Sequence, residues 1–346
     1  LTKIGSVQGY SIQEGKKIPE EGRLYYRGFL IEDILKEFGK EKFFSFEKTM
    51  FLLLFGKIPT NFELKMFNST LKEYRTLPDE FIENFILRQP SKDIMNQLQR
   101  TVLCLYTIDK NPDDTSLENL INQALHLIAK FPSLLVYSYH AVNHKHFKQS
   151  FIHNPVKEYS IAQNILHMLR PDSSFTALEA EILDLILLIH AEHGGGNNST
   201  FTSHVVSSTG TDTYSSVSAS IGSLKGPLHG GANCMVSNMI EDIKKNCSYT
   251  NEEFLKEYIR KIFMGEAFDR SGKVYGMGHA IYTLSDPRAV ILKKKAYELA
   301  KEKGQLEEFE LFSNVEKFTK EIGKEIKGES FEICANVDLY SGFVYK

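Results

Sequence analysis

The residues best suited to chemistry lie in three short clusters that combine histidine with glycine. These clusters are HAEHGGGN (190–197), GPLHGGAN (226–233) and GMGH (276–279). Imidazole can act as an acid, a base or a hydrogen-bond donor near neutral pH. Glycine beside it lets the backbone turn tightly and approach a ligand. We therefore expect a binding or catalytic surface built from these loops; the alternative for His229 is a turn histidine with no role.

Three familiar kinds of site fit these clusters poorly. A phosphate loop of the Walker type needs a lysine, and neither Lys nor Arg occurs between Ala191 and Leu224. Zinc would need a third ligand beside His190 and His193, and the HAEH spacing is not the H-E-x-x-H spacing, so we expect no metal. A dinucleotide fingerprint would need glycine where Ile281 stands.

Two charged residues add chemical potential to the clusters. Arg288 follows an Asp-Pro pair, so it lies in the first turn of a helix, where the macrodipole disfavours a cation. It either shares an anion with the helix N-terminus or is a solvated arginine. Asp338 stands between Val337 and Leu339, and an apolar neighbourhood would raise the pKa of its carboxyl and make it a competent base. The alternative for Asp338 is a turn or cap residue.

Helical signals dominate the elements that must position these residues. Three segments have the capping-box pattern that opens a helix: Thr115–Glu118, Thr176–Glu179 and Thr250–Glu253. Asp286 before Pro287 predicts another helix start, and that helix should run to Gly304. Strand signals are confined to 1–12 and 22–28. We predict an all-α, mostly helical fold with short β elements near the N-terminus.

Length and composition narrow the class of protein. A chain of 346 residues is long for one core, so we expect two lobes. The net charge of -3 argues against a nucleic-acid partner. The apolar run before His190 is interrupted by Asp184 and is too short for a membrane span. No signal peptide is visible and the four cysteines are scattered, which is typical of a reducing compartment, so we expect a cytoplasmic protein; the start at Leu1 leaves targeting open.

Taken together, the clusters resemble the citrate synthase family, in its citrate/2-methylcitrate synthase branch. The matching motifs occur in order and cover nearly the whole chain. They are GRLYYRGFLIEDIL, IHAEHGGGNNSTFTSHVVSSTGTDTYSSVSASIGSLKGPLHGGAN, GMGHAIYTLSDPRA and CANVDLYSGFVYK.

The resemblance implies a Claisen-type condensation of acetyl-CoA with oxaloacetate, followed by hydrolysis of citryl-CoA to citrate and CoA. Asp338 would be the general base, His229 the donor to the enol oxygen, and His279 the residue that polarises the ketone of oxaloacetate. His193 and Arg288 would hold the carboxylates of oxaloacetate, with His190 a weaker candidate. Acetyl-CoA is then a substrate and no cofactor is expected.

The same resemblance implies a CoA contact and an architecture. The residues expected against CoA are Val274, Gly276, Met277, Gly278 and Asn336. The family fold is a homodimer of two-domain chains. It predicts a large helical domain over 1–230, with 337–346 returning to it, and a small domain over 231–336 that carries the GMGH and DPRA motifs.

The resemblance also leaves alternatives open. In the family the chain continues past the catalytic aspartate into helices with two further arginines, whereas this sequence stops at Lys346 and starts late. We therefore expect a chain truncated at both ends and severely impaired on its own. A 2-methylcitrate synthase that uses propionyl-CoA, a non-catalytic CoA- or dicarboxylate-binding homologue and a histidine-ligated metallohydrolase remain as rival interpretations.

Overall fold

The computed structural model describes residues 4–39, 44–149, 151–227 and 229–346. Helices dominate it, so the predicted all-α fold class is confirmed. The described chain divides into two compact units, which we treat separately. Unit 1 contains residues 26–229 and the short stretch up to Gly5, and unit 2 contains residues 6–25 and 230–346.

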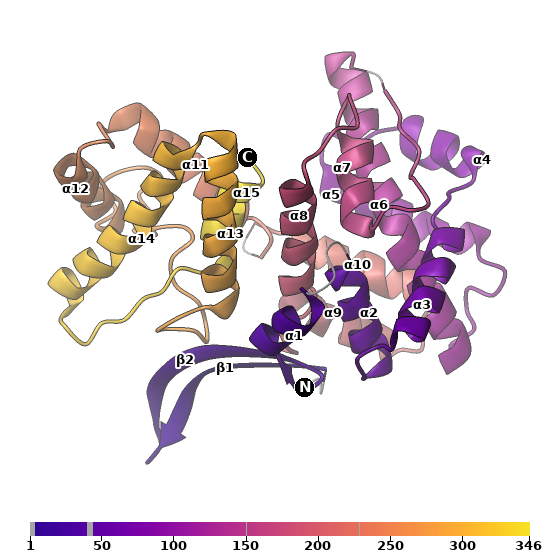
Figure 1. The fold of residues 1–346 in the computed structure, drawn as a ribbon, viewed down its shortest axis with the longest axis horizontal. Helices are drawn as coiled ribbons and strands as arrows, with labels where there is room; N and C mark the ends of the chain where they lie inside the picture. The colour runs from indigo at the N-terminus through magenta and orange to yellow at the C-terminus, as the bar shows by residue number, and fades with distance from the viewer. Residues whose placement is uncertain (1–3, 40–43, 150, 228) are drawn as a thin grey trace. The chain divides into compact units, whose positions relative to one another are not determined.

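Unit 1 is a bundle of helices around a long central helix, α6, which lies beside α5 and α7 (Figure 1). Its core includes Leu98 and Val102 of α5 and Leu134 and Tyr137 of α6, all at most 4% exposed. The elements are β3 (Phe29–Leu30), α1 (Ile31–Phe38), α2 (Ser45–Phe55), α3 (Asn61–Tyr74), α4 (Asp79–Phe81), the π-helical turn η1 (Ile82–Leu87), α5 (Ile94–Cys104), the 3₁₀ turn η2 (Leu105–Ile108), α6 (Leu117–Phe147), α7 (Ile161–Leu169), α8 (Ala177–Ile189), α9 (Asn198–Ser207) and α10 (Thr213–Lys225).

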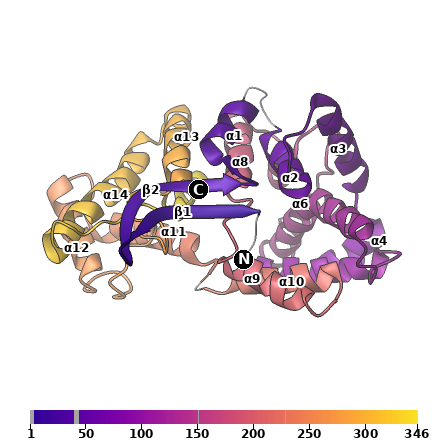
Figure 2. The same cartoon turned by 90° about the horizontal axis from the view of Figure 1, so that it is seen from below.

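Unit 2 combines a β-hairpin with five helices. Strands β1 (Gly5–Gln13) and β2 (Lys16–Tyr26) run side by side in Figure 2. Glu14 and Gly15 join them, and both have positive φ, 50° and 78°, as the tightest hairpin turns require. The helices are α11 (Ala232–Asn246), α12 (Glu252–Phe263), α13 (Pro287–Lys303), α14 (Leu306–Lys327) and α15 (Val337–Val344).

Helix starts follow the predicted chemistry, with two shifts of one residue. The capping box at Thr176 and the start of α13 at the Asp286 cap are confirmed, and α13 ends at Gly304 with φ 67° as predicted. The other two predicted boxes are wrong by one position. Ser116, not Thr115, caps α6, and Asn251, not Thr250, caps α12. In both cases the next polar side chain reaches the exposed backbone N–H groups instead.

Two segments that are remote in sequence pack within unit 2. Helix α15 contacts α11 and α13, so 337–346 lies in the same compact unit as those helices, and its return to the large domain stays a prediction. The hairpin also belongs to unit 2, because the backbone N–H of Gly22 donates to Ser285 Oγ at 3.1 Å and the Tyr282 hydroxyl to the carbonyl of Arg23 at 3.4 Å. The bounds 1–230 and 231–336 stay a prediction about the working domains.

Within the described part of the chain, none of the helices has the length and apolar character that a bilayer span requires.

Candidate functional site

His279 lies in the loop before α13, and its ring orientation is fixed by backbone donors. Its Nδ1 accepts hydrogen bonds from the N–H groups of Ile281, at 3.1 Å, and Tyr282, at 3.2 Å. Because Nδ1 is an acceptor, a neutral ring carries its proton on Nε2. The ring also stacks on buried Tyr282, with 4.7 Å between centroids. His279 therefore presents a neutral N–H donor whose direction is set by the loop.

The charge state of His279 follows from its surroundings. Burial lowers the pKa of the imidazole; the carboxylate of Asp286 opposes this effect and the cation of Arg288 adds to it. The net shift is downward from the ordinary value, so the neutral form is favoured at pH 7. A neutral imidazole can polarise a carbonyl by donating a hydrogen bond.

Arg288 is buried and paired with the residue that caps its own helix. Its Nε donates to Asp286 Oδ1 at 3.0 Å and its Nη2 to Oδ2 at 2.7 Å. The two side chains are only 8% and 0% exposed. Arg288 is therefore paired with Asp286 and the solvated alternative is wrong, while a bound anion shared with the helix N-terminus stays a prediction. This bidentate pair holds a planar cation beside His279.

The glycine-rich loop before His279 is held against the segment that leads into α15. Met277 and Ala335 form a β-bridge, and the N–H of Gly278 donates to the carbonyl of Cys334 at 2.7 Å. Gly276 has φ 82°, and a Cβ there would lie 2.8 Å from Leu339 Cβ. Val274 at the start of the loop is 6% exposed. Only glycine meets both demands at position 276.

Asp338 lies in the first turn of α15, where the helix dipole favours a negative charge. Its side chain is half-buried, and its N–H donates to Asn336 Oδ1 at 3.0 Å. The cap residue of α15 is thus Asn336, so the alternative of Asp338 as the cap is wrong. The carboxylate is positioned by a helix rather than by a flexible turn.

The three candidate histidines of unit 1 occupy different local settings. His229 is half-buried, and its Nε2 lies 3.0 Å from Ser199 Oγ in α9. Helix α8 ends at Ile189, so His190 and His193 do not share a helical face. His190 is exposed, with Nδ1 2.8 Å from the carbonyl of Ile186, whereas His193 is half-buried. His190 is the C-terminal cap of α8, so the helix ends before it reaches His193.

Unit 2 brings four of the predicted residues into one neighbourhood: His279, Arg288, Asn336 and Asp338. The charge of Arg288 acts on His279, and Asn336 contacts both Asp338 and the residue before His279. Unit 1 holds His190, His193 and His229. Sequence reasoning missed Ser199 and Tyr282, because neither partner carries a spacing signal. It named Asp286 only as a cap, although the Asp-Pro-Arg order was a usable sign of the ion pair.

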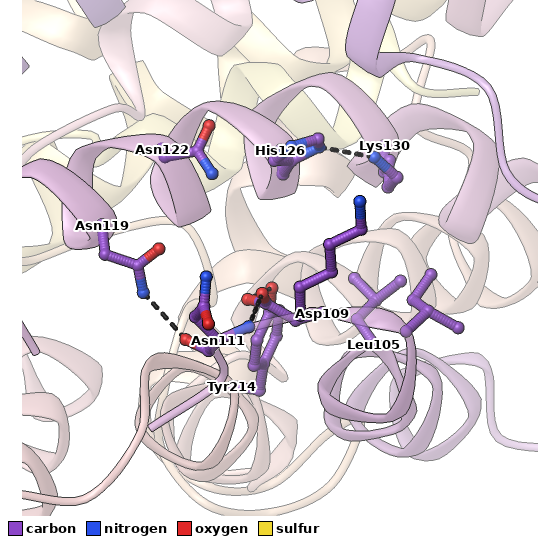
Figure 3. A pocket seen from close by; sticks show the side chains of 10 residues that line it. Leu105, Asp109, Asn111, Asn119, Asn122, His126, Lys130 and Tyr214 are labelled. Atoms are coloured by element: carbon purple, nitrogen blue, oxygen red, sulfur yellow. Dashed lines mark hydrogen bonds between the residues drawn. The ribbon is translucent and has the colours of Figure 1, made fainter. Parts of the chain in front are cut away.

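A separate cavity of about 370 Å³ lies within unit 1 and contains none of the predicted site residues (Figure 3). Burial lowers the pKa of Lys130 to about 8, and burial together with Lys130 lowers that of His126 to about 4. The Lys130 Nζ and the His126 Nδ1 are 2.8 Å apart. The lining residues are Leu105, Ile108, Asp109, Lys110, Asn111, Asn119, Asn122, His126, Lys130 and Tyr214.

Among the residues that the structure describes, no group of three or more His, Cys, Asp or Glu side chains is arranged to hold a metal ion.

Comparisons with known proteins agree with the helical fold and the loop motifs. The family model described as "Citrate synthase, C-terminal domain" matches residues 2–346. The citrate synthase of Haloferax volcanii is 32% identical over 331 residues, which is 94% of this chain and 79% of that protein. The 2-methylcitrate synthase 1 of Corynebacterium glutamicum is 32% identical over 289 residues, 82% of this chain and 70% of that protein.

Solved structures extend the same relationship to three dimensions. The citrate synthase of Pyrobaculum aerophilum superposes with a TM-score of 0.81 at 28% identity, covering 100% of this chain and 79% of that chain. The chain therefore belongs to the citrate synthase family, whose members are acyltransferases. The resemblance found in the sequence motifs is confirmed.

Proposed function

We propose that this chain condenses acetyl-CoA with oxaloacetate and hydrolyses the resulting citryl-CoA to citrate and CoA. One observation carries the proposal: two backbone N–H groups bind His279 Nδ1, and the buried Asp286–Arg288 pair lies beside that ring. A neutral N–H donor next to a fixed cation suits a substrate with a ketone and a neighbouring carboxylate. Oxaloacetate has both groups.

The proposed reaction begins at the methyl group of acetyl-CoA. Asp338 removes a methyl proton, and the electron pair of that C–H bond forms an enolate whose oxygen accepts a hydrogen bond from His229. The enolate carbon then bonds to the ketone carbon of oxaloacetate, while His279 Nε2–H stabilises the developing alkoxide. Water finally attacks the thioester, the C–S bond breaks, and CoA leaves as the thiol. His193 and Arg288, with His190 in a lesser role, hold the carboxylates.

The loop 274–278 is the proposed contact for CoA. Gly276 and Gly278, with φ 82° and 87°, keep its backbone in a conformation that other residues rarely adopt. Backbone amides without side-chain bulk can approach a ligand closely, which supports the role given to this loop.

Propionyl-CoA is the second candidate acyl donor, because relatives of similar identity include 2-methylcitrate synthases. One methylene in an apolar pocket changes specificity by only about 1–3 kcal/mol. The donor is therefore decided by comparing kcat/KM for the two thioesters.

We also propose a homodimer and a cytoplasmic location. Helix α9 buries none of its residues within the chain, and Phe201 and Val205 on it are 61% and 51% exposed, which supports packing against a second copy. Cys104, Cys234, Cys247 and Cys334 are all free thiols, as expected in a reducing compartment. Sedimentation velocity tests the dimer; a single species at monomer mass would contradict it.

The test of function is thiol release by the purified protein. Release should require both acetyl-CoA and oxaloacetate, and Asp338→Asn should reduce it at least about 100-fold, the scale of general-base catalysis. Propionyl-CoA and a protein-free blank are the comparisons. Binding of oxaloacetate by isothermal titration without any thiol release would favour a non-catalytic homologue and overturn the proposal.

A further inference from the structure

Asn336 uses both polar ends of its side chain inside the protein. Its Oδ1 accepts the N–H of Asp338 at 3.0 Å, and its Nδ2 donates to the carbonyl of Gly278 at 2.8 Å. Its backbone N–H also donates to the carbonyl of Gly276 at 2.9 Å. Asn336 thus contacts Gly276 and Gly278 of the loop and the backbone of Asp338.

These bonds belong to a tight joint between the loop and α15. The Met277–Ala335 bridge and the bond from the Gly278 N–H to the carbonyl of Cys334 fix the same two segments backbone to backbone. Behind them, Gly276 packs so close to Leu339 that no Cβ fits. Within this joint, the Asn336 amide is the side chain that bonds directly both to Gly278, beside His279, and to Asp338.

We propose that Asn336 is a positioning residue that sets the spacing between the Asp338 carboxylate and the His279 ring. This inference rests on the proposed function, in which Asp338 removes the proton and His279 polarises the ketone. The role differs from the CoA contact expected from the sequence, because the amide is already engaged at both ends. Misplacing reacting groups by about 1 Å can cost about 100-fold in rate, so the amide acts on the chemical step.

The chemistry of position 336 separates capping from positioning. Serine is a good N-cap, so Asn336→Ser keeps an acceptor for the first turn of α15. Its hydroxyl is too short to reach the Gly278 carbonyl that the longer amide binds. Asn251 provides a matched control in the same unit, because it caps α12 by accepting from the N–H groups of Glu253 and Phe254. Asn251→Ser changes a cap without touching the joint.

The experiment compares Asn336→Ser and Asn251→Ser with the parent protein in steady-state thiol release, using acetyl-CoA and its methyl-deuterated form. Asn336→Ser should lower kcat about 10- to 100-fold, leave KM for acetyl-CoA within about threefold and raise the deuterium isotope effect on kcat, because proton removal becomes slower. Asn251→Ser should change none of these quantities. A raised KM with unchanged kcat would instead assign Asn336 to CoA binding and overturn the proposal, as would unchanged kinetics.

Hydrogen–deuterium exchange separates this inference from the proposed function. In Asn336→Ser the amides of residues 276–282 should exchange about tenfold faster, including the Ile281 and Tyr282 amides that bind His279, while α12 and α14 stay protected. A parent protein that releases no thiol would contradict the proposed function. Faster exchange of residues 276–282 in Asn336→Ser would then still support the contact of Asn336 with this loop. Unchanged exchange in 276–282 would overturn the positioning role whatever the activity.

Discussion

The carboxylate of Asp286 holds the guanidinium of Arg288 through two hydrogen bonds, 3.0 Å from Nε to Oδ1 and 2.7 Å from Nη2 to Oδ2. Asp286 is 1% exposed and Arg288 is 6% exposed. A charge buried this deeply depends on its partner, because water cannot replace the partner. The pair therefore stabilises the start of α13, because Asp286 is also the cap of that helix.

Asp286→Ala should destabilise the protein by about 3–5 kcal/mol, because it leaves Arg288 buried without its anion and removes the cap of α13. Urea unfolding measures the change. The double variant Asp286→Ala with Arg288→Met should recover part of that loss, since the orphaned charge is gone. If the destabilisation of the double variant equals the sum of the losses measured for Asp286→Ala and Arg288→Met separately, the two side chains are not coupled.

Gly276→Ala tests the close packing of the loop. Alanine there must adopt φ 82° and place its Cβ 2.8 Å from Leu339 Cβ, so we expect a loss of about 2–4 kcal/mol and a strong fall in thiol release. Gly304→Ala is the matched control, because Gly304 has φ 67° but nothing within 4 Å of a Cβ. It should cost only about 1–2 kcal/mol and leave activity intact. Equal losses in both variants would contradict the packing argument.

A buried acid in unit 1 should make stability depend on pH. Glu47 accepts the N–H of Ile161 at 2.7 Å, and burial together with the nearby charge of Asp184 raises the pKa of Glu47 to about 8. The folded state then holds a proton that the unfolded chain releases above about pH 4.5. Stability from this group is full below that pH and is lost as pH rises toward 8.

Glu47→Gln should remove this loss, since the amide keeps the acceptor and cannot ionise. Urea unfolding from pH 5 to 8 should show little difference at pH 5 and a gain on the order of 2–4 kcal/mol at pH 8. Exposed Glu80 is the control, and Glu80→Gln should leave the profile unchanged. A Glu47→Gln protein that still loses stability as steeply as the parent would show that Glu47 does not hold the proton.

Local signals in the sequence were enough to predict the helical fold class and several helix ends. The Asp286-Pro287 start, the Gly304 end and the cap at Thr176 each depend on neighbours within four residues, which a linear pattern contains. The motif order was enough to identify the family.

Contacts between distant segments could not be predicted in the same way. The attachment of Gly22 to Ser285 spans 263 residues, and the packing of α15 on α11 and α13 joins helices that are not neighbours in the sequence. The end of α8 at Ile189 carries no glycine or proline signal, because the first glycine after it is Gly194. The dual bonding of Asn336 was likewise invisible, because its Gly278 partner lies 58 residues away.

The central claim is that His279 is a neutral donor through Nε2, and two-bond ¹H–¹⁵N correlation NMR of the histidine ring tests it directly. At pH 7 the account predicts a protonated Nε2 and an unprotonated Nδ1 for the residue whose signals vanish in His279→Gln. A proton on Nδ1, or a fully charged imidazolium at that pH, would contradict the account.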